Sequence, residues 1–170
     1  VKSYGGNVVF CESTISAREM KVQELIDEYK YTFIHPFDDY SVIAGQGSIA
    51  CELESQLQEP LDKLLIPVGG GGLISGISFF AKKNGGIAAT IIGAEPETAR
   101  DATDSFYSKT HVTDYKPMTI ADGLRATLGV KNFEIILKNV DEFITATESE
   151  IIAAMKIIWS RLKVIVEPSA

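Results

Sequence analysis

Four consecutive glycines, Gly69 to Gly72, constrain the fold of this chain more than any other feature of its sequence. They stand between an apolar run, "LLIPV" (64–68), and a stretch with helical character, "LISGISFFAKK" (73–83). Glycine loses more backbone freedom on folding than any other residue, so four together are costly in regular structure. We therefore expect a loop whose backbone is approached closely by another group.

Short runs typical of β-strands alternate with helical patterns along the chain. The predicted strands cover 7–12, 32–37, 63–68, 89–96 and 142–147, and the predicted helices cover 16–30, 40–58, 73–83, 97–109, 132–140 and 149–163. Thr147 and Glu150 have the spacing of a capping box before the last helix. The alternation predicts an α/β fold with an open, largely parallel sheet and flanking helices.

The glycines follow a predicted strand and precede a predicted helix, where open α/β sheets bind their ligands. Glycine N–H groups can turn inward there, and the helix adds its positive dipole end, so a phosphate group is the expected ligand. The loop is not a P-loop, because Leu73 and Ile74 stand where a P-loop has Lys followed by Ser or Thr. A dinucleotide-binding fingerprint, with Glu95 as its acidic residue, is only a weak match. Close packing of helix on sheet stays open as a structural explanation. An uncharged loop of this kind suits a cofactor with one phosphate monoester.

The net charge of −7 and the pI near 4.9 argue against a nucleic-acid partner. Cys11 and Cys51 lack the spacing of a zinc site or a disulfide framework, which indicates reduced thiols. Neither a transmembrane segment nor a signal peptide is recognisable, so we expect a cytoplasmic protein without a membrane partner. The chain begins close to an apolar run and stops directly after another, so we expect it to be part of a longer protein.

Five motifs in order, "HPFDDYSVIAGQGSIACE", "IPVGGGGLISGI", "GAEP", "TIADGL" and "VEPSA", resemble the serine racemase and serine/threonine dehydratase family over essentially the whole chain. The resemblance implies a two-domain pyridoxal-phosphate enzyme of fold type II, like the tryptophan synthase β-subunit. Residues 1–37 would complete a small α/β domain, and 38–170 would form part of the large cofactor-binding domain. The implied reaction is racemisation of L-serine to D-serine with accompanying β-elimination to pyruvate and ammonia.

The resemblance also implies the cofactor contacts. Gly69, Gly70, Gly71 and Gly72, with the backbone of Leu73, would cradle the phosphate of pyridoxal phosphate, so a Cβ at Gly70 or Gly71 would intrude where the phosphate oxygens approach. Phe37 would line the cofactor, at a position that is often Asn in racemases and Phe in dehydratases. Gly123 would leave room at the substrate end of the ring, and Glu167 would lie near the cofactor.

A divalent-cation site and a nucleotide site are implied as well. Glu95, the carbonyl of Ala99 and Asp101 would bind Mg²⁺ or Ca²⁺, with Asp62 in the outer shell and Lys131 at a position that is Asn in some relatives. Carboxylate and carbonyl oxygens suit either cation, although solvated acids on an acidic surface remain an alternative. Tyr4 and Lys163 match residues that contact ATP, as an effector, at the interface of a homodimer.

The chain carries no expected catalytic residue. By resemblance, the Schiff-base lysine belongs upstream of Val1, so this chain by itself would be inactive. Lys63, Lys82 and Lys83 are expected to be solvated, and His35 and His111 lack partners at triad spacing. Two alternatives stay open: a dedicated L-serine/L-threonine dehydratase, which Phe37 favours, and a non-catalytic regulatory module that binds a phosphate ligand.

Overall fold

In the computed structural model, which describes residues 1–12, 14–84 and 87–170, three of the five predicted strands form one parallel sheet. The chain divides into two units, Val1–Ile34 and His35–Ala170, and the sheet belongs to the second. Among the described residues, no helix is long and apolar enough to cross a membrane.

The first unit contains a short 3₁₀ helix, η1 (Lys2–Tyr4), and the helix α1 (Ile15–Tyr29), which confirms the helix predicted over 16–30. Thr14 caps α1 because its side-chain oxygen accepts the N–H of Ala17 at 3.1 Å. The strand predicted over 7–12 is wrong, and Phe10 within it is 82% exposed. The described residues of this unit contain no strand with which the run could pair, and the backbone bond that it does make is local, from the N–H of Thr14 to the carbonyl of Glu12 at 2.9 Å.

The second unit is built on β1 (Lys63–Pro67), β2 (Thr90–Pro96) and β3 (Glu142–Ala146), in the spatial order β1-β2-β3. Both neighbouring pairs are parallel, with Ile66 beside Gly93 and Gly93 beside Phe143. The strand predicted over 32–37 is wrong: it crosses the boundary between the units, and Pro36 has no N–H to give to a sheet.

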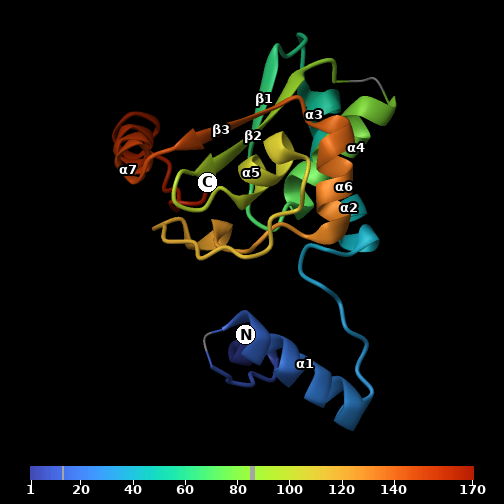
Figure 1. Cartoon of the computed structure of the whole chain (residues 1–170). Helices are drawn as coiled ribbons and strands as arrows, with labels where there is room; N and C mark the ends of the chain where they lie inside the picture. Colours follow the sequence, from blue (N-terminus) through green and yellow to red (C-terminus); the bar gives the residue numbers. More distant parts are fainter. Residues whose placement is uncertain (13, 85–86) are drawn as a thin grey trace. The chain divides into compact units, whose positions relative to one another are not determined.

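Helices surround this sheet (Figure 1). They are α2 (Tyr40–Gln46), α3 (Ser48–Gln56), α4 (Gly72–Asn84), α5 (Asp101–Ser108), α6 (Val130–Asn139) and α7 (Glu148–Ile157), with the 3₁₀ turn η2 (Asp122–Leu124) and the π-helical turn η3 (Ile158–Leu162). The single helix predicted over 40–58 is divided at Gly47 into α2 and α3. The capping box of α7 is confirmed, because Thr147 and Glu150 each bond the other's backbone N–H.

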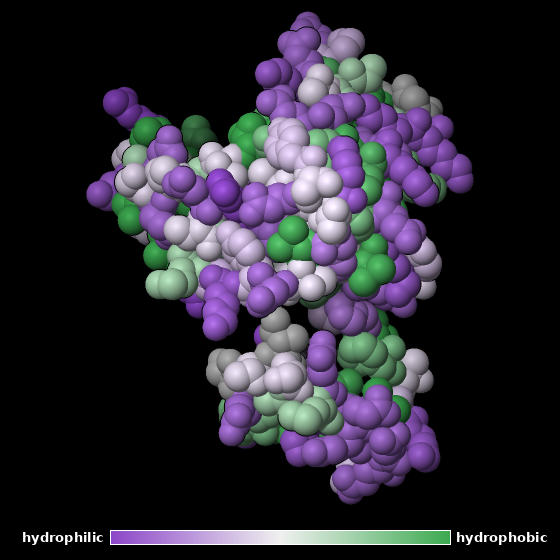
Figure 2. Space-filling view, in the orientation of Figure 1, coloured by the Kyte–Doolittle hydropathy of each residue, from purple (hydrophilic) through white to green (hydrophobic). Residues whose placement is uncertain are grey.

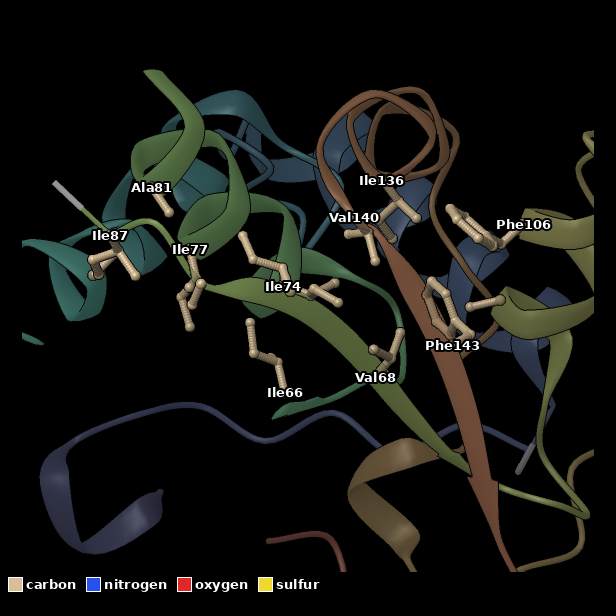
Figure 3. Packing of buried hydrophobic residues seen from close by; sticks show 14 of the residues in the cluster. Ile66, Val68, Ile74, Ile77, Ala81, Ile87, Phe106, Ile136, Val140 and Phe143 are labelled. Atoms are coloured by element: carbon tan, nitrogen blue, oxygen red, sulfur yellow. The ribbon is translucent and has the colours of Figure 1, made fainter. Parts of the chain in front are cut away.

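The core lies between the sheet and α4, against which α2, α3 and α6 also pack. Figure 3 shows Ile74 and Ile77 of α4 with Ile66 and Val68, and Ile136 of α6 above Phe143. These side chains are at most 4% exposed. Each buried aliphatic or aromatic side chain contributes about 1.5–3 kcal/mol, so this cluster fixes where β1 ends and α4 begins. On the face seen in Figure 2, hydrophobic residues lie in small groups among hydrophilic ones.

Candidate cofactor-binding site

The glycine loop connects the carboxyl end of β1 to the amino end of α4. Val68 donates its N–H to the carbonyl of Ala94 at 2.9 Å and so holds the chain beside β2 until the first glycine. α4 begins at Gly72, and Ser75 donates its N–H to the carbonyl of Gly71 at 3.0 Å. The loop therefore lies at the sheet edge where a parallel α/β fold binds ligands, as the sequence predicts.

The loop presents unpaired backbone donors. Within the described residues, the N–H groups of 69–73 donate to no protein acceptor. Gly71 has a φ of 87°, a left-handed conformation that glycine adopts without strain. Consecutive N–H groups at the start of a thirteen-residue helix suit an anion, because the helix dipole adds positive potential there. The residues present fit a phosphate group.

A cavity of about 330 Å³ opens onto the loop. All seven residues predicted for the cofactor line it: Gly69, Gly70, Gly71, Gly72, Leu73, Phe37 and Gly123. Glu167 and Ser169 also line it. The structure thus brings these segments together from four places in the sequence, while their contact with a cofactor stays a prediction.

The glycines also allow close packing. At Gly71, an added Cβ would point toward α6 and not toward the expected phosphate. A Cβ at Gly71 would lie 2.6 Å from Leu128 Cδ1 and 2.9 Å from Asn132 Cβ, so it would point into the contact with α6. The prediction that it would intrude on the phosphate is wrong for Gly71. A Cβ at Gly70 would lie 2.4 Å from the ring of Phe37, which lines the cavity. Packing against α6 at Gly71 and against Phe37 at Gly70 therefore requires glycine in this loop.

Phe37 is held by its neighbour His35. His35 Nδ1 accepts the N–H of Phe37 at 3.3 Å and the N–H of Asp38 at 2.8 Å, so a neutral ring carries its proton on Nε2. The rings of His35 and Phe37 meet edge to face, with 4.6 Å between centroids. This turn keeps the phenyl ring beside the glycine loop.

The opposite wall of the cavity is the turn that carries Gly123. Ser169, which is buried, accepts the N–H of Gly123 on its Oγ at 2.9 Å. Glu148 accepts the N–H of Ile120 at 2.9 Å, and this bond lowers the pKa of the Glu148 carboxyl. Sequence reasoning missed Ser169 as a support, although it lies in the motif "VEPSA".

Two buried carboxyl groups flank the loop between β2 and α5: Glu95 lies near the end of β2, and Asp101 is the first residue of α5. Glu95 accepts the N–H groups of Ala102 and Thr103 and the hydroxyl of Thr103, at 2.7 to 3.2 Å. Asp101 accepts the N–H of Leu128 at 2.7 Å. Burial raises the pKa of Glu95 to about 8 and that of Asp101 to about 6. A cation would favour the ionised form of both, which is consistent with the predicted site.

Asp62 does not belong to this loop. It is exposed and precedes β1, where its carbonyl accepts the N–H of Thr90 at the amino end of β2. Glu95 lies near the carboxyl end of β2, five residues later, or about 16 Å along the strand. Asp62 is therefore too far away for an outer-shell role. No group of three His, Cys, Asp or Glu side chains that could hold a metal occurs in the described part of the chain.

Lys131, expected near the metal, instead donates from its Nζ to the carbonyl of Asp38 at 3.0 Å. His111 contacts the carbonyl of Leu128 through Nε2 at 2.7 Å and stacks on Phe133. Its imidazole therefore has a hydrogen-bond partner and a packing contact within the protein.

None of the three lysines judged non-catalytic lines the cavity. Lys63 and Lys83 are exposed, and Lys82 pairs with Asp141 at 3.0 Å. Tyr4 is 94% exposed in the first unit, and Lys163 is exposed in the second. The ATP role of Tyr4 and Lys163 stays a prediction.

A parallel sheet, a glycine loop whose N–H groups have no acceptor in the described chain, and an adjoining cavity are typical of an α/β protein that binds a phosphate group. Residues 1–170 match the family described as pyridoxal-phosphate dependent enzymes, and the chain belongs to this family. Pyridoxal phosphate is thus the cofactor that the glycine loop fits.

Comparison with known relatives shows which enzymes of this family the chain is similar to. A serine racemase of Dictyostelium discoideum is 46% identical over 98% of this chain and 52% of its own length. The structure of maize serine racemase has a TM-score of 0.93 at 38% identity and covers 99% of this chain and 52% of its own. The processed form of threonine deaminase isoform 2 from Solanum lycopersicum has a TM-score of 0.90 at 34% identity, over 99% of this chain and 46% of its own. The chain spans about half the length of the curated relatives it matches. Named as enzymes, these proteins do not favour a non-catalytic module.

Proposed function

We propose that the protein containing this chain racemises L-serine to D-serine and also eliminates its β-hydroxyl to give pyruvate and ammonia. The observation that carries the proposal is the glycine loop: its N–H groups at 69–73 have no protein acceptor in the described chain, and its residues line a cavity sized for a small cofactor. The similarity to serine racemases supports the choice of substrate. Bound pyridoxal phosphate supplies an electron sink for loss of the substrate's α-proton.

In this proposal, each wall of the cavity has one task. The N–H groups of 69–73 bind the phosphate and so fix the position of the ring. Phe37 covers one side and excludes water, because its phenyl ring is held in place by the His35 turn. Gly123, anchored by Ser169, leaves space for the substrate. The lysine that carries the cofactor is proposed to lie outside this chain.

A dedicated L-serine/L-threonine dehydratase is the second candidate, and Phe37 favours it. A phenyl ring at this position cannot hydrogen-bond a cofactor or substrate, whereas the Asn expected of racemases can. The similarity to a threonine deaminase is also consistent with this candidate.

Further proposals concern the rest of the protein. Glu95, Asp101 and the Ala99 carbonyl are proposed to bind Mg²⁺ or Ca²⁺, and Tyr4 and Lys163 to contact ATP in a homodimer. The division into a small-domain remainder at 1–37 and a large-domain part at 38–170 also stays a proposal. The cytoplasmic location stays a proposal as well.

The test is a product assay on the full-length protein reconstituted with pyridoxal phosphate. L-serine and L-threonine are supplied separately, and D-serine is measured by chiral chromatography beside keto acid and ammonia. Formation of D-serine supports the racemase, whereas keto acid without D-serine supports the dehydratase. Phe37→Asn is expected to raise the ratio of D-serine to pyruvate. If neither product forms while the cofactor is bound, the proposed function is wrong.

A further inference from the structure

Asn132 connects two walls of the cavity. It lies in the first turn of α6 and is fully buried, at 0% exposure. Its Nδ2 donates to the carbonyl of Phe37 and to the carbonyl of Gly70, both at 2.9 Å. Two carbonyl acceptors around one atom fix the orientation of the amide, because Oδ1 in that place would repel both.

The contact with Asn132 sets the direction of one peptide plane in the glycine loop. The Gly70 carbonyl also accepts the N–H of Gly129 at 3.1 Å, so it is directed toward the start of α6 by two donors. The described chain contains no cis peptide bond, and in a trans peptide the C=O and the following N–H point in opposite directions. The Gly71 N–H therefore points away from α6, and it has no protein acceptor in the described chain.

The surroundings of Asn132 hold it in place. Asp38 accepts the N–H of Lys131 at 2.9 Å and that of Asn132 at 3.4 Å, so it caps α6 from the segment that carries Phe37. The Asn132 Oδ1 atom is buried and has no hydrogen-bond partner in the described chain. An unpaired buried oxygen is costly, and a leucine has the same number and branching of side-chain heavy atoms without it. Packing alone therefore does not account for asparagine at this position.

We propose that Asn132 is a positioning residue for the cofactor phosphate: by holding the Gly70 carbonyl toward α6, it aims the Gly71 N–H at the phosphate. The inference rests on the proposed binding of pyridoxal phosphate at this loop. Asn132 acts through Gly70 and Gly71 and does not itself touch the ligand. Replacing Asn132 therefore weakens the binding of ligands that carry a phosphate. The binding of the same ring without a phosphate is little affected.

The experiment compares the full-length protein with its Asn132→Leu variant, using pyridoxal phosphate and pyridoxal as matched ligands. Dissociation constants are measured by visible absorption or fluorescence titration. Asn132→Leu is expected to bind pyridoxal phosphate about ten- to a hundredfold more weakly, because two hydrogen bonds to carbonyls are lost and the loop loosens. Its affinity for pyridoxal should change less than about threefold. Thermal unfolding confirms that the variant folds, and Asn132→Ala, which is smaller and brings no charge, serves if it does not.

Asn139→Leu is the matched control, because Asn139 also lies in α6 and donates its Nδ2 to a backbone carbonyl, that of Ile135, at 2.9 Å. It should bind both ligands as the wild type does. An unchanged affinity of Asn132→Leu for pyridoxal phosphate overturns the inference, and so does an equal loss for both ligands. A wild type that binds pyridoxal phosphate no better than pyridoxal overturns the proposed phosphate site instead.

Discussion

Replacing Gly71 by alanine is the most direct test of the glycine loop. Alanine at a φ of 87° is strained by about 1–3 kcal/mol. Its Cβ would also lie 2.6 Å from Leu128 Cδ1 and 2.9 Å from Asn132 Cβ, and overpacking of this kind costs about 1–3 kcal/mol. The sum of about 2–6 kcal/mol is an upper estimate that a shift of the loop would reduce, and it lies below most of the range of domain stability, about 5–15 kcal/mol. We therefore expect a folded protein whose loop leaves its present conformation.

Cofactor retention should fall much more than stability. If the displaced loop loses two N–H contacts to a charged phosphate, at about 1.5–3 kcal/mol each, affinity falls by roughly a hundredfold to ten-thousandfold. The assay is visible absorption of the full-length holoenzyme after extensive dialysis, with circular dichroism to verify the fold. Gly45→Ala is the matched control, because a Cβ at Gly45 meets nothing within 4 Å and alanine favours a helix. A folded Gly71→Ala protein that retains its cofactor like the control would refute the assignment of the phosphate to this loop.

Two further predictions concern stability. Burial raises the pKa of Glu95 from 4.5 to about 8, so in chelator-treated protein the contribution of Glu95 to stability should be fully present below about pH 4.5 and be lost as the pH rises through 8. The rise in Tm on adding Mg²⁺ should therefore grow over this interval. Thermal unfolding with chelator or Mg²⁺ checks this, and an equal Mg²⁺ response in Glu95→Gln would contradict the proposed site. Thr147→Ala removes the cap of α7 and should cost about 1 kcal/mol in chemical denaturation, whereas Ser149→Ala at the exposed second helical position should cost less.

The strands of the sheet could be predicted from the sequence because their signals are local. Each of β1, β2 and β3 is a short apolar run followed by a turn and a helix, and each pairs with another such run. The runs at 7–12 and 32–37 also contain several apolar residues but find no partner strand in the described chain. An apolar run alone does not show whether a neighbour exists, so these two predictions failed.

The candidate site divides in the same way. The glycine loop follows from the sequence because its donors belong to the backbone, and the motif resemblance supplied Phe37 and Gly123. Asn132 had no signal, since its two acceptors lie 62 and 95 residues away along the chain. The outer-shell role predicted for Asp62 was wrong because proximity in sequence to β1 does not show at which end of the sheet a residue lies.

Helix α4 serves at once as the ligand's anchor and as the support of the core. The N–H groups of 69–73, which have no acceptor in the described chain, precede α4 or lie at its first two residues, while Ile74, Ile77 and Ala81 are buried against the sheet and the neighbouring helices. Free energy gained from ligand binding at the loop therefore stabilises α4, the most heavily packed helix of the unit. Cofactor supply would then govern how long the protein survives proteolysis in the cell. Hydrogen exchange at Ala81 would report cofactor occupancy at a loop about two and a half helical turns away.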